Sequence, residues 1–309
     1  MPLRIANATY GVNRALKEGA VKTKLDLQFV EVGAITTNGM RPMVRDLAFD
    51  ICEMAFTTYL CARAAGKPLI AIPVFVTRNF HHWAAFVHAK SGIKSPKDLE
   101  GRRVGVNRGY TVTTGLWIRG VLQHEYGVDL DKITWCPTDE EHVAEFKAPA
   151  NVDHRYVGRS AAELLASGEF AAAIGDIRLD SPDVRPLIPN AREAGFAYYR
   201  KTGIYPVNHG IVVQTAVLER DPQIAVELFT AFAAAKEIYR ARLAARQNLD
   251  KADETALALS EVVGDPFPFG IAANRKALEA IVAFAVEQHL LPRPYTPEEL
   301  FAKNTWTLG

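Results

Sequence analysis

Hydrophobic and polar positions along the first third of the chain predict strands and helices in turn. Residues 25–32 alternate apolar and polar side chains, as a half-buried strand does, whereas residues 69–76 are almost continuously apolar, as in a buried strand. Helical spacing extends over residues 41–47 and 56–65, and the second stretch ends at Gly66 and Pro68. Two more strands are predicted at residues 3–6 and 50–55. This alternation is typical of a parallel sheet with helices on its faces.

A second α/β unit begins near Ser95, where a short predicted helix ends at Gly101. The strands expected in it cover residues 103–106 and 133–136, an amphipathic helix covers 116–126, and a helix, glycine turn and strand follow over 161–176. The polar stretch 142–159 is predicted to be a surface insertion. From residue 210 the chain forms a strand and then mostly helices. We therefore predict two lobes, residues 1–88 with 210–309 and residues 89–209.

Composition and charge limit the classes of function. The chain has 309 residues, and its 36 basic and 35 acidic side chains give a net charge of +1, so no nucleic-acid or membrane-surface partner is indicated. The N-terminal sequence has no signal-peptide pattern, and no apolar run is long enough to span a bilayer. Cys52, Cys61 and Cys136 form no C-x-x-C motif and are expected to be buried, with a catalytic thiol as the alternative. These features predict a cytoplasmic protein.

Five segments carry a resemblance to known families. DLEGRRVGV at residues 98–106 and LASGEFAAAI at 165–174 resemble the second lobe of type II periplasmic binding proteins. EMAFTTYL at 53–60, PVFVTRNFHH at 73–82 and GIYPVNH at 203–209 are similar to the 4,5-dihydroxyphthalate decarboxylase family, and this likeness extends over roughly residues 3–291. It implies an α/β, two-lobed fold of the type II periplasmic-binding-protein kind, with mixed, mostly parallel sheets and an interlobe cleft.

The same resemblance implies a carboxy-lyase that needs no cofactor. Its reaction would be the non-oxidative decarboxylation of a hydroxylated aromatic dicarboxylate, 4,5-dihydroxyphthalate giving protocatechuate and CO2. Each hydroxyl of that substrate is para to one carboxylate, so a base acting on the hydroxyl pushes electron density to the carbon that loses CO2. No flavin, pyridoxal or metal is then needed to accept the electrons.

Histidines near strand ends are the expected proton donors. His81 and His82 follow a buried strand, and because adjacent residues of an extended chain point in opposite directions, one is expected to face the cleft and the other to support it. His209 lies where the chain returns to the first lobe. Imidazole exchanges protons near neutral pH, which suits it to protonate a ring carbon. Glu53 is expected to orient a histidine or to accept a phenol proton, with a structural ion pair as the alternative.

Anion-binding residues are predicted in both lobes. Arg78 is the first candidate to clamp a carboxylate, because its planar guanidinium makes two parallel hydrogen bonds. Free backbone N–H groups at helix starts also bind anions, although threonines there can act as ordinary caps. The other predicted binding residues are Arg108, Arg14, Tyr110, Thr111, Thr113, Thr114, Thr57, Thr58 and Asp176, the last with an ion pair to Arg178 as the alternative.

Other functions are less well supported by the sequence. No metal-binding, dinucleotide, P-loop or serine-hydrolase motif occurs, although Glu53, His82 and His209 could in principle share a metal. The main alternative is a non-catalytic solute-binding protein for a small anionic or aromatic ligand, since one fold serves many functions. A third reading is another cytosolic enzyme on this scaffold, related to menaquinone-pathway enzymes or thiamine-pyrimidine synthases. The expected partner is the small aromatic dicarboxylate itself, and a homo-oligomer is left open.

Overall fold

The computed structural model describes residues 2–178, 180–246 and 248–309 and divides the chain into two compact units. Unit 1 runs from the N-terminus to Arg78 and continues with Val207–Glu279 and Tyr295–Gly309, whereas unit 2 comprises Asn79–Pro206 and Ala280–Pro294. These boundaries differ from those expected, 88 and 210. Residues 85–88 pair with strands of unit 2, and residues 280–294 also cluster with it.

Unit 1 is built on a five-stranded sheet in the order β2-β1-β3-β10-β4. Its strands are β1 Leu3–Ala6, β2 Leu27–Phe29, β3 Ile51–Ala55, β4 Leu69–Arg78 and β10 Val207–Gln214. β1 pairs in parallel with β2 and β3, whereas β10 is antiparallel to both β3 and β4. The sheet is therefore mixed, and the carboxyl ends of β1, β3 and β4 lie at one edge.

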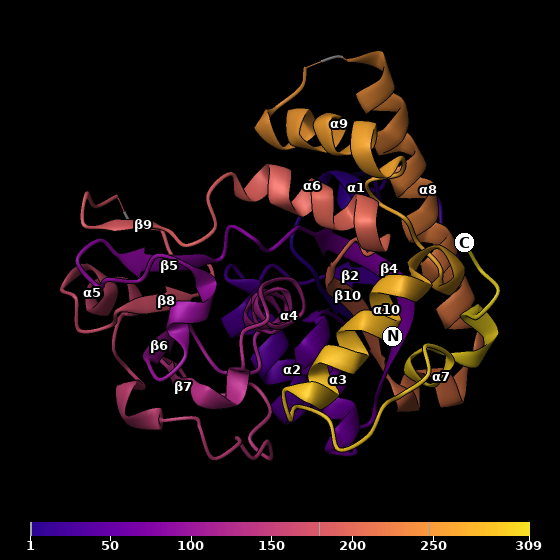
Figure 1. Ribbon diagram of the computed structural model, residues 1–309. Helices are drawn as coiled ribbons and strands as arrows, with labels where there is room; N and C mark the ends of the chain where they lie inside the picture. The colour runs from indigo at the N-terminus through magenta and orange to yellow at the C-terminus, as the bar shows by residue number, and fades with distance from the viewer. Residues whose placement is uncertain (1, 179, 247) are drawn as a thin grey trace. The chain divides into compact units, whose positions relative to one another are not determined.

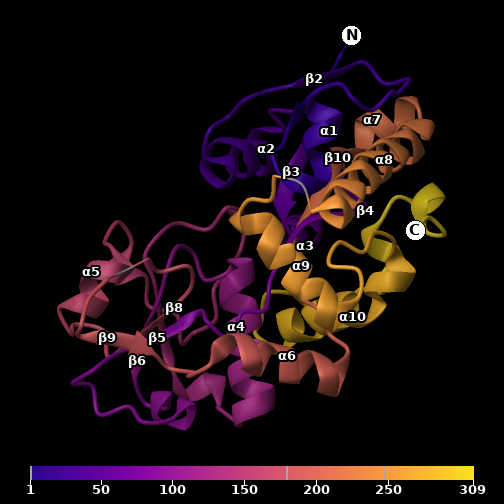
Figure 2. The same cartoon turned by 90° about the horizontal axis from the view of Figure 1, so that it is seen from above.

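Helices cover the faces of this sheet. They are α1 Gly11–Lys17, α2 Arg41–Asp46, α3 Phe56–Ala64, α7 Thr215–Arg220, α8 Gln223–Ala245, α9 Lys251–Val263 and the first half of α10 Ile271–Glu287. A π-helix at Ile35–Met40 leads into α2. Figures 1 and 2 both show α1 beside α8, and a Cβ at Gly11 would lie 2.2 Å from the ring of Tyr239 on α8. Gly11 therefore permits the close approach of the two helices.

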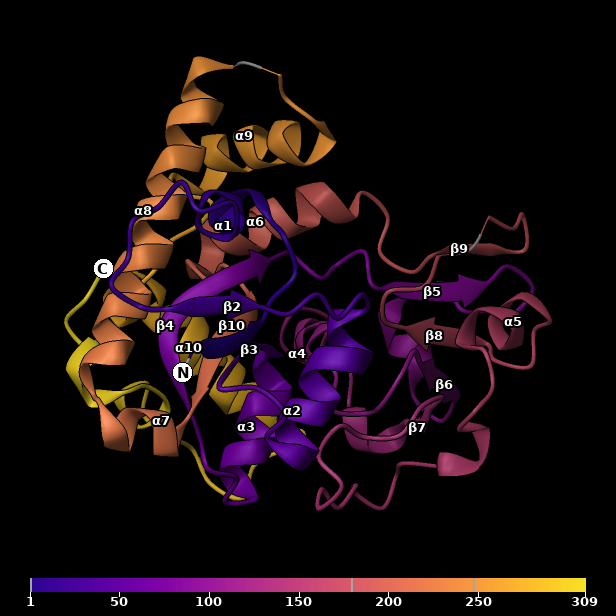
Figure 3. The same cartoon turned by 180° about the vertical axis from the view of Figure 1, so that it is seen from behind.

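Unit 2 has its own five-stranded mixed sheet, in the order β7-β6-β8-β5-β9. The strands are β5 Ala85–His88, β6 Arg103–Val106, β7 Thr134–Pro137, β8 Ala172–Ile174 and β9 Val184–Pro186, and the helices are α4 Thr113–Tyr126, α5 Ala161–Ala166 and α6 Ala191–Thr202. Figure 3 shows α5 beside β8, and Ala161 and Leu165 of α5 pack against Ala173 of β8 in a buried cluster. The predicted mixed α/β fold is confirmed.

Short 3-10 turns complete the secondary structure, at Pro96–Leu99, Leu130–Lys132, His154–Tyr156, Glu298–Leu300 and Lys303–Thr305. The predicted surface insertion at 142–159 contains one of these turns, and Val152 makes an isolated bridge to Trp135 of β7. Within the described residues, no helix is both long enough and apolar enough to cross a membrane.

Candidate active site

Glu53 is the centre of a polar cluster inside unit 1. It lies in the middle of β3 and has no exposed surface. Its Oε1 accepts hydrogen bonds from the Tyr10 hydroxyl (2.7 Å) and pairs with His209 Nδ1 (2.7 Å). Its Oε2 accepts from Asn7 Nδ2 (2.9 Å) and from the Ala8 backbone N–H (3.0 Å). A buried carboxylate is costly unless it is hydrogen-bonded, and these four donors meet that requirement.

Strand register brings His209 to Glu53. In the antiparallel pair, Ile211 of β10 is opposite Glu53, and His209 is two residues further along the same face. Diagonal neighbours of this kind lie within reach of long side chains. The pairing of β10 with β4 is irregular around His209, as at a β-bulge, and bulges re-aim side chains. Sequence spacing could not have shown this contact, because 156 residues separate the two partners.

The second nitrogen of His209 remains available. The His209 side chain is 16% exposed, and within the described part of the chain its Nε2 makes no hydrogen bond. The orientation of the ring is fixed by the hydrogen bond between Nδ1 and Glu53. A carboxylate at Nδ1 orients an imidazole and stabilises its protonated form, which leaves Nε2 to exchange a proton with a bound molecule. The pair is therefore arranged for acid–base chemistry.

The loop after β1 supplies the remaining donors to Glu53. Tyr10 precedes α1, and its backbone N–H donates to Asn13 Oδ1 (2.7 Å). The amide of Asn13, which is fully buried, donates in turn to Asn7 Oδ1 and to the Ala8 carbonyl (2.7 Å). This network holds Asn7, Ala8 and Tyr10 in one arrangement around the carboxylate.

Electrostatics keeps Glu53 ionised and Tyr10 neutral. Burial alone would raise the pKa of the Glu53 carboxyl, but the hydrogen bond and charge of His209, with the bonds from Tyr10 and Ala8, hold that pKa below its ordinary value. The pKa of the Tyr10 phenol is raised, first by burial and then by the charge of Glu53 and the hydrogen bond to it. Tyr10 therefore acts as a hydrogen-bond donor to a carboxylate at neutral pH.

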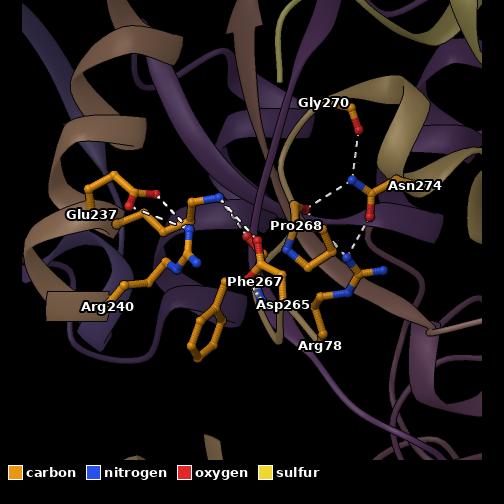
Figure 4. Close-up of polar contacts among 9 residues, drawn as sticks. Arg78, Glu237, Arg240, Asp265, Phe267, Pro268, Gly270 and Asn274 are labelled. Atoms are coloured by element: carbon orange, nitrogen blue, oxygen red, sulfur yellow. Dashed lines mark hydrogen bonds and ion pairs between the residues drawn. The ribbon is translucent and has the colours of Figure 1, made fainter. Parts of the chain in front are cut away.

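Arg78 ends β4 and is half-buried. Its Nη1 donates to Asn274 Oδ1 (2.5 Å) and to the Pro268 carbonyl (3.4 Å), and Figure 4 shows the guanidinium directed at both. Asn274, which is 2% exposed, also donates to the carbonyls of Pro268 and Gly270. These contacts of Nη1 restrict the orientation of the guanidinium at the end of β4.

The other predicted residues of unit 1 differ in exposure. Thr57 and Thr58 are the second and third residues of α3, which directly follows β3, and they are 0% and 2% exposed. Arg14 lies on α1 with its side chain 53% exposed, and its Nη1 is 3.8 Å from Glu18 Oε1. The threonines are therefore part of the interior near the end of β3, whereas Arg14 belongs to an exposed ion pair.

His81 and His82 belong to unit 2, and each is 1% exposed. His81 stacks on Trp117 of α4 with ring centroids 6.4 Å apart. His82 Nε2 is 2.7 Å from Glu125 Oε2, on the same helix, and its ring lies beside Tyr198. Burial and the Glu125 charge raise the pKa of Tyr198 to about 12. The two imidazoles thus contact different residues of α4, and they do so from a turn that begins at His81, where the Ala84 N–H donates to the His81 carbonyl (2.9 Å).

The loop before α4 already binds a carboxylate, that of Glu141. The Glu141 side chain accepts from Tyr110 N (2.5 Å), Thr111 N (3.1 Å) and Thr111 Oγ1 (2.5 Å). Thr113 and Thr114 are the first two residues of α4, and no side chain caps that helix at Val112. The loop therefore has the expected affinity for carboxylates, but sequence reasoning missed the internal one that occupies it.

Behind this loop lies a buried cation that the sequence did not single out. The Arg119 guanidinium is fully buried 4.0 Å from the centre of the Tyr110 ring, and it donates to the Tyr110 carbonyl (2.8 Å) and to Gln288 Oε1 (2.7 Å). Arg108, in contrast, is exposed and has a positive φ of 73°.

Three remaining expectations concern Asp176, metals and cysteines. Asp176 is exposed and lies 3.7 Å from Arg178, which fits the structural ion pair weighed as its alternative. In residues 2–178, 180–246 and 248–309, no group of three or more His, Cys, Asp and Glu side chains could hold a metal ion. The three cysteines are free and buried, and burial raises the pKa of the Cys52 thiol.

Comparison with known proteins identifies the family. The chain is 32% identical over 277 residues to a curated 4,5-dihydroxyphthalate decarboxylase of Comamonas testosteroni, and the match covers 83% of each chain. This chain belongs to the 4,5-dihydroxyphthalate decarboxylase family. A second curated decarboxylase of that name, from Pseudomonas putida, is 34% identical over 139 residues, which is 42% of this chain and 54% of the relative. Both relatives are named as decarboxylases, so the family is one of carboxy-lyases. The resemblance predicted from the sequence is confirmed.

A broader family and solved structures agree with the fold of the decarboxylase family. The NMT1/THI5-like family model matches residues 36–238, more than half of the chain. The periplasmic aliphatic sulphonate binding protein SsuA of Escherichia coli aligns with a TM-score of 0.53 at 14% identity, covering 99% of this chain and 98% of that protein. The desulfurization enzyme DszB aligns with a TM-score of 0.55 at 17% identity, covering 99% and 97%. The predicted periplasmic-binding-protein-like fold is confirmed.

Proposed function

We propose that this chain is a carboxy-lyase that removes one carboxylate from a hydroxylated aromatic dicarboxylate, namely 4,5-dihydroxyphthalate, to give protocatechuate and CO2. The names of its curated relatives support the substrate and the reaction. The observation in the chain itself that carries the proposal is the buried Glu53–His209 pair, in which Nε2 of the imidazole is available for proton exchange.

The reaction requires a proton at the ring carbon that bears the departing carboxylate. The substrate hydroxyl para to that carbon supplies electron density, and the carbon takes a proton from an acid. The C–C bond then breaks, its electron pair restores the aromatic ring, and CO2 leaves. A hydrogen ion replaces the carboxylate, so the acid must be reprotonated from water before the next turnover.

In our proposal His209 is this acid. Protonated His209 donates from Nε2, while Nδ1 stays hydrogen-bonded to Glu53. The carboxylate of Glu53 is already ionised, so it stabilises the imidazolium before the proton is transferred. Tyr10, which donates to the same Glu53 oxygen, keeps that oxygen in position.

Arg78 is proposed to hold the carboxylate that remains on the product. Two parallel hydrogen bonds from a guanidinium would fix the plane of the ring relative to the proton donor. Its contacts with Asn274 and Pro268 restrict its rotation before substrate binds. Thr113 and Thr114 are kept as proposed carboxylate-binding residues, whereas Tyr110 and Thr111 already donate to Glu141 and would bind substrate only if that side chain were displaced.

The remaining predicted residues keep secondary roles in the proposal. Thr57 and Thr58 are buried, so they would support the end of β3 from the interior, and Arg108 and Arg14 would attract the dianion through long-range charge. Arg14 and Arg108 are exposed, so their contribution should decrease at high salt.

Turnover of a defined substrate tests the proposal. Purified, chelator-treated protein is mixed with 4,5-dihydroxyphthalate, and release of CO2 and formation of protocatechuate are followed over time. Stoichiometric formation of both products is expected. Tight binding of the diacid without turnover would instead support a solute-binding protein.

Histidine variants then identify the proton donor. His209→Gln should lower kcat by about 100-fold or more, the usual effect of losing a general acid. The exposed His154 provides a matched control, because His154→Gln removes an imidazole far from any predicted site residue in sequence. If His82→Asn or His81→Asn abolishes turnover while His209→Gln retains it, the donor is in unit 2 and our assignment is wrong.

A further inference from the structure

Unit 1 contains a pocket that the proposed reaction does not use. It has a volume of about 650 Å³ and lies where α7, the end of α3 and the C-terminal segment meet the start of β4. Ile70, Leu218, Pro222 and Ala302 form its mostly apolar wall. Pockets of about 300–1,000 Å³ with apolar walls and a few polar groups are the usual sites for small molecules.

The pocket and the Glu53–His209 pair are at opposite edges of the sheet. His209 is paired with Thr77 near the end of β4, whereas Ile70 is the second residue of that strand. At about 3.3 Å per residue, the two positions are separated by on the order of 20 Å. A molecule of the size of a substituted benzene could not occupy both.

Hydrogen bonds to backbone carbonyls hold the walls of this pocket. Ala302 N donates to the Ala71 carbonyl (2.9 Å), and the Tyr59 hydroxyl donates to the Leu300 carbonyl (2.5 Å). Asn304 Nδ2 donates to the Pro222 carbonyl (2.6 Å), which ties the C-terminal segment to the turn before α8. The pocket is therefore preformed, so a ligand would not have to order it.

Charged groups in the lining indicate the chemistry of a ligand. Arg63 and Lys303 are the two cations of the pocket and Glu219 is its one carboxylate. Among the residues that the structure describes, neither cation is within 4.0 Å of a carboxylate oxygen. Arg63 Nη1 donates to the Leu69 carbonyl (3.3 Å), which holds the guanidinium at the pocket wall. Two cations beside a mostly apolar wall favour a ligand with an acidic group, because a charge-assisted hydrogen bond is stronger than a neutral one.

We propose that this pocket binds a small apolar, preferably aromatic, molecule that carries one acid group. The apolar part of the ligand lies against Ile70 and Leu218. Its acid group accepts hydrogen bonds from Arg63 and forms an ion pair with Lys303. The site is separate from the proposed active site, and the proposal does not depend on the decarboxylase reaction.

A pair of fluorescent probes tests this assignment. 1-Anilinonaphthalene-8-sulfonate and N-phenyl-1-naphthylamine share an apolar ring system, but only the first has an acid group. Arg63→Met and Lys303→Met should each weaken binding of the sulfonate by about 10-fold, the effect of losing one charge-assisted contact, and change binding of the neutral probe by less than about 2-fold. Lys22→Met, which removes an exposed cation elsewhere in unit 1, should leave both affinities unchanged.

A variant in which a larger side chain fills the pocket tests whether the probes bind there. Leu218→Trp adds a large ring to the wall and should weaken binding of both probes by at least about 10-fold, with the circular dichroism spectrum and melting temperature as folding controls. Unchanged affinities in Leu218→Trp would show that the probes bind elsewhere and would overturn the proposal. If Leu218→Trp weakens binding but neither Arg63→Met nor Lys303→Met discriminates between the probes, the acid assignment is wrong. Lys303 is exposed, so its variant remains informative even if Arg63→Met fails to fold.

Discussion

Replacement of Glu53 by glutamine tests the acid–base pair most directly. Glutamine has almost the same shape as glutamate, so its carbonyl oxygen can still accept from Asn7 and Ala8, as Oε2 does in the native chain. Its NH2 group, however, would face His209 Nδ1 and the Tyr10 hydroxyl, which both use Oε1 now. The variant removes the negative charge and reverses the direction of hydrogen bonding at the imidazole.

The expected loss follows from these contacts. A hydrogen bond to a charged group contributes about 1.5–3 kcal/mol. The substitution removes such a bond from the imidazolium, and because both partners of the native bond are charged we take the upper value. If about 3 kcal/mol of this is expressed in the transition state, kcat falls by about 100-fold, because each 1.36 kcal/mol is a factor of ten in rate.

The assay is the initial rate of protocatechuate formation at saturating substrate and one pH near neutrality, for native protein and variant. Glu287→Gln is a matched control, because Glu287 also pairs with a histidine (His124, 2.7 Å) but both side chains are exposed. That control should leave kcat unchanged. A Glu53→Gln protein that is folded and retains kcat within about 3-fold would refute the role given to the pair.

Four other outcomes are expected. Arg78→Met should raise KM by about 30-fold with little change in kcat, because the lost contact of about 2 kcal/mol is made before and during the reaction. Gly11→Ala should lower the free energy of unfolding by about 1–3 kcal/mol in urea titrations, since the new methyl group would overlap the Tyr239 ring at 2.2 Å. Glu141→Gln should cost about 1–2 kcal/mol in the same measurement, as the charge that accepts three hydrogen bonds is lost. Because the pKa of Glu53 in the folded chain lies below its ordinary value of 4.5, the ionised carboxylate stabilises the fold above pH 4.5, and this stabilisation is lost as the pH falls through the lowered pKa. The melting temperature should therefore decrease more steeply below pH 4.5 in native protein than in Glu53→Gln.

Local patterns predicted most of the secondary structure. The apolar run at 69–76 became β4, and the helical spacing at 56–65 became α3, because burial on one or both faces sets the period of apolar positions. The alternating stretch 25–32 is shorter in the structure, where only Leu27–Phe29 pairs with β1. The ends of the units were predicted less well, because 79–88 and 280–294 join unit 2 through contacts with residues distant in sequence.

The sequence by itself indicated the family and the α/β class, because motifs and strand ends are local properties of the chain. It put His81 and His82 first as proton donors and named Glu53, His209 and Arg78 as further candidates. Only the tertiary structure decided which of these side chains meet. His209 reaches Glu53 because β10 pairs antiparallel with β3, and Tyr10 and Asn7 join them because β1 lies on the other side of β3. Hydrogen-bond partners of a buried charge come from strands far apart in sequence, and their register depends on the packing of the whole sheet.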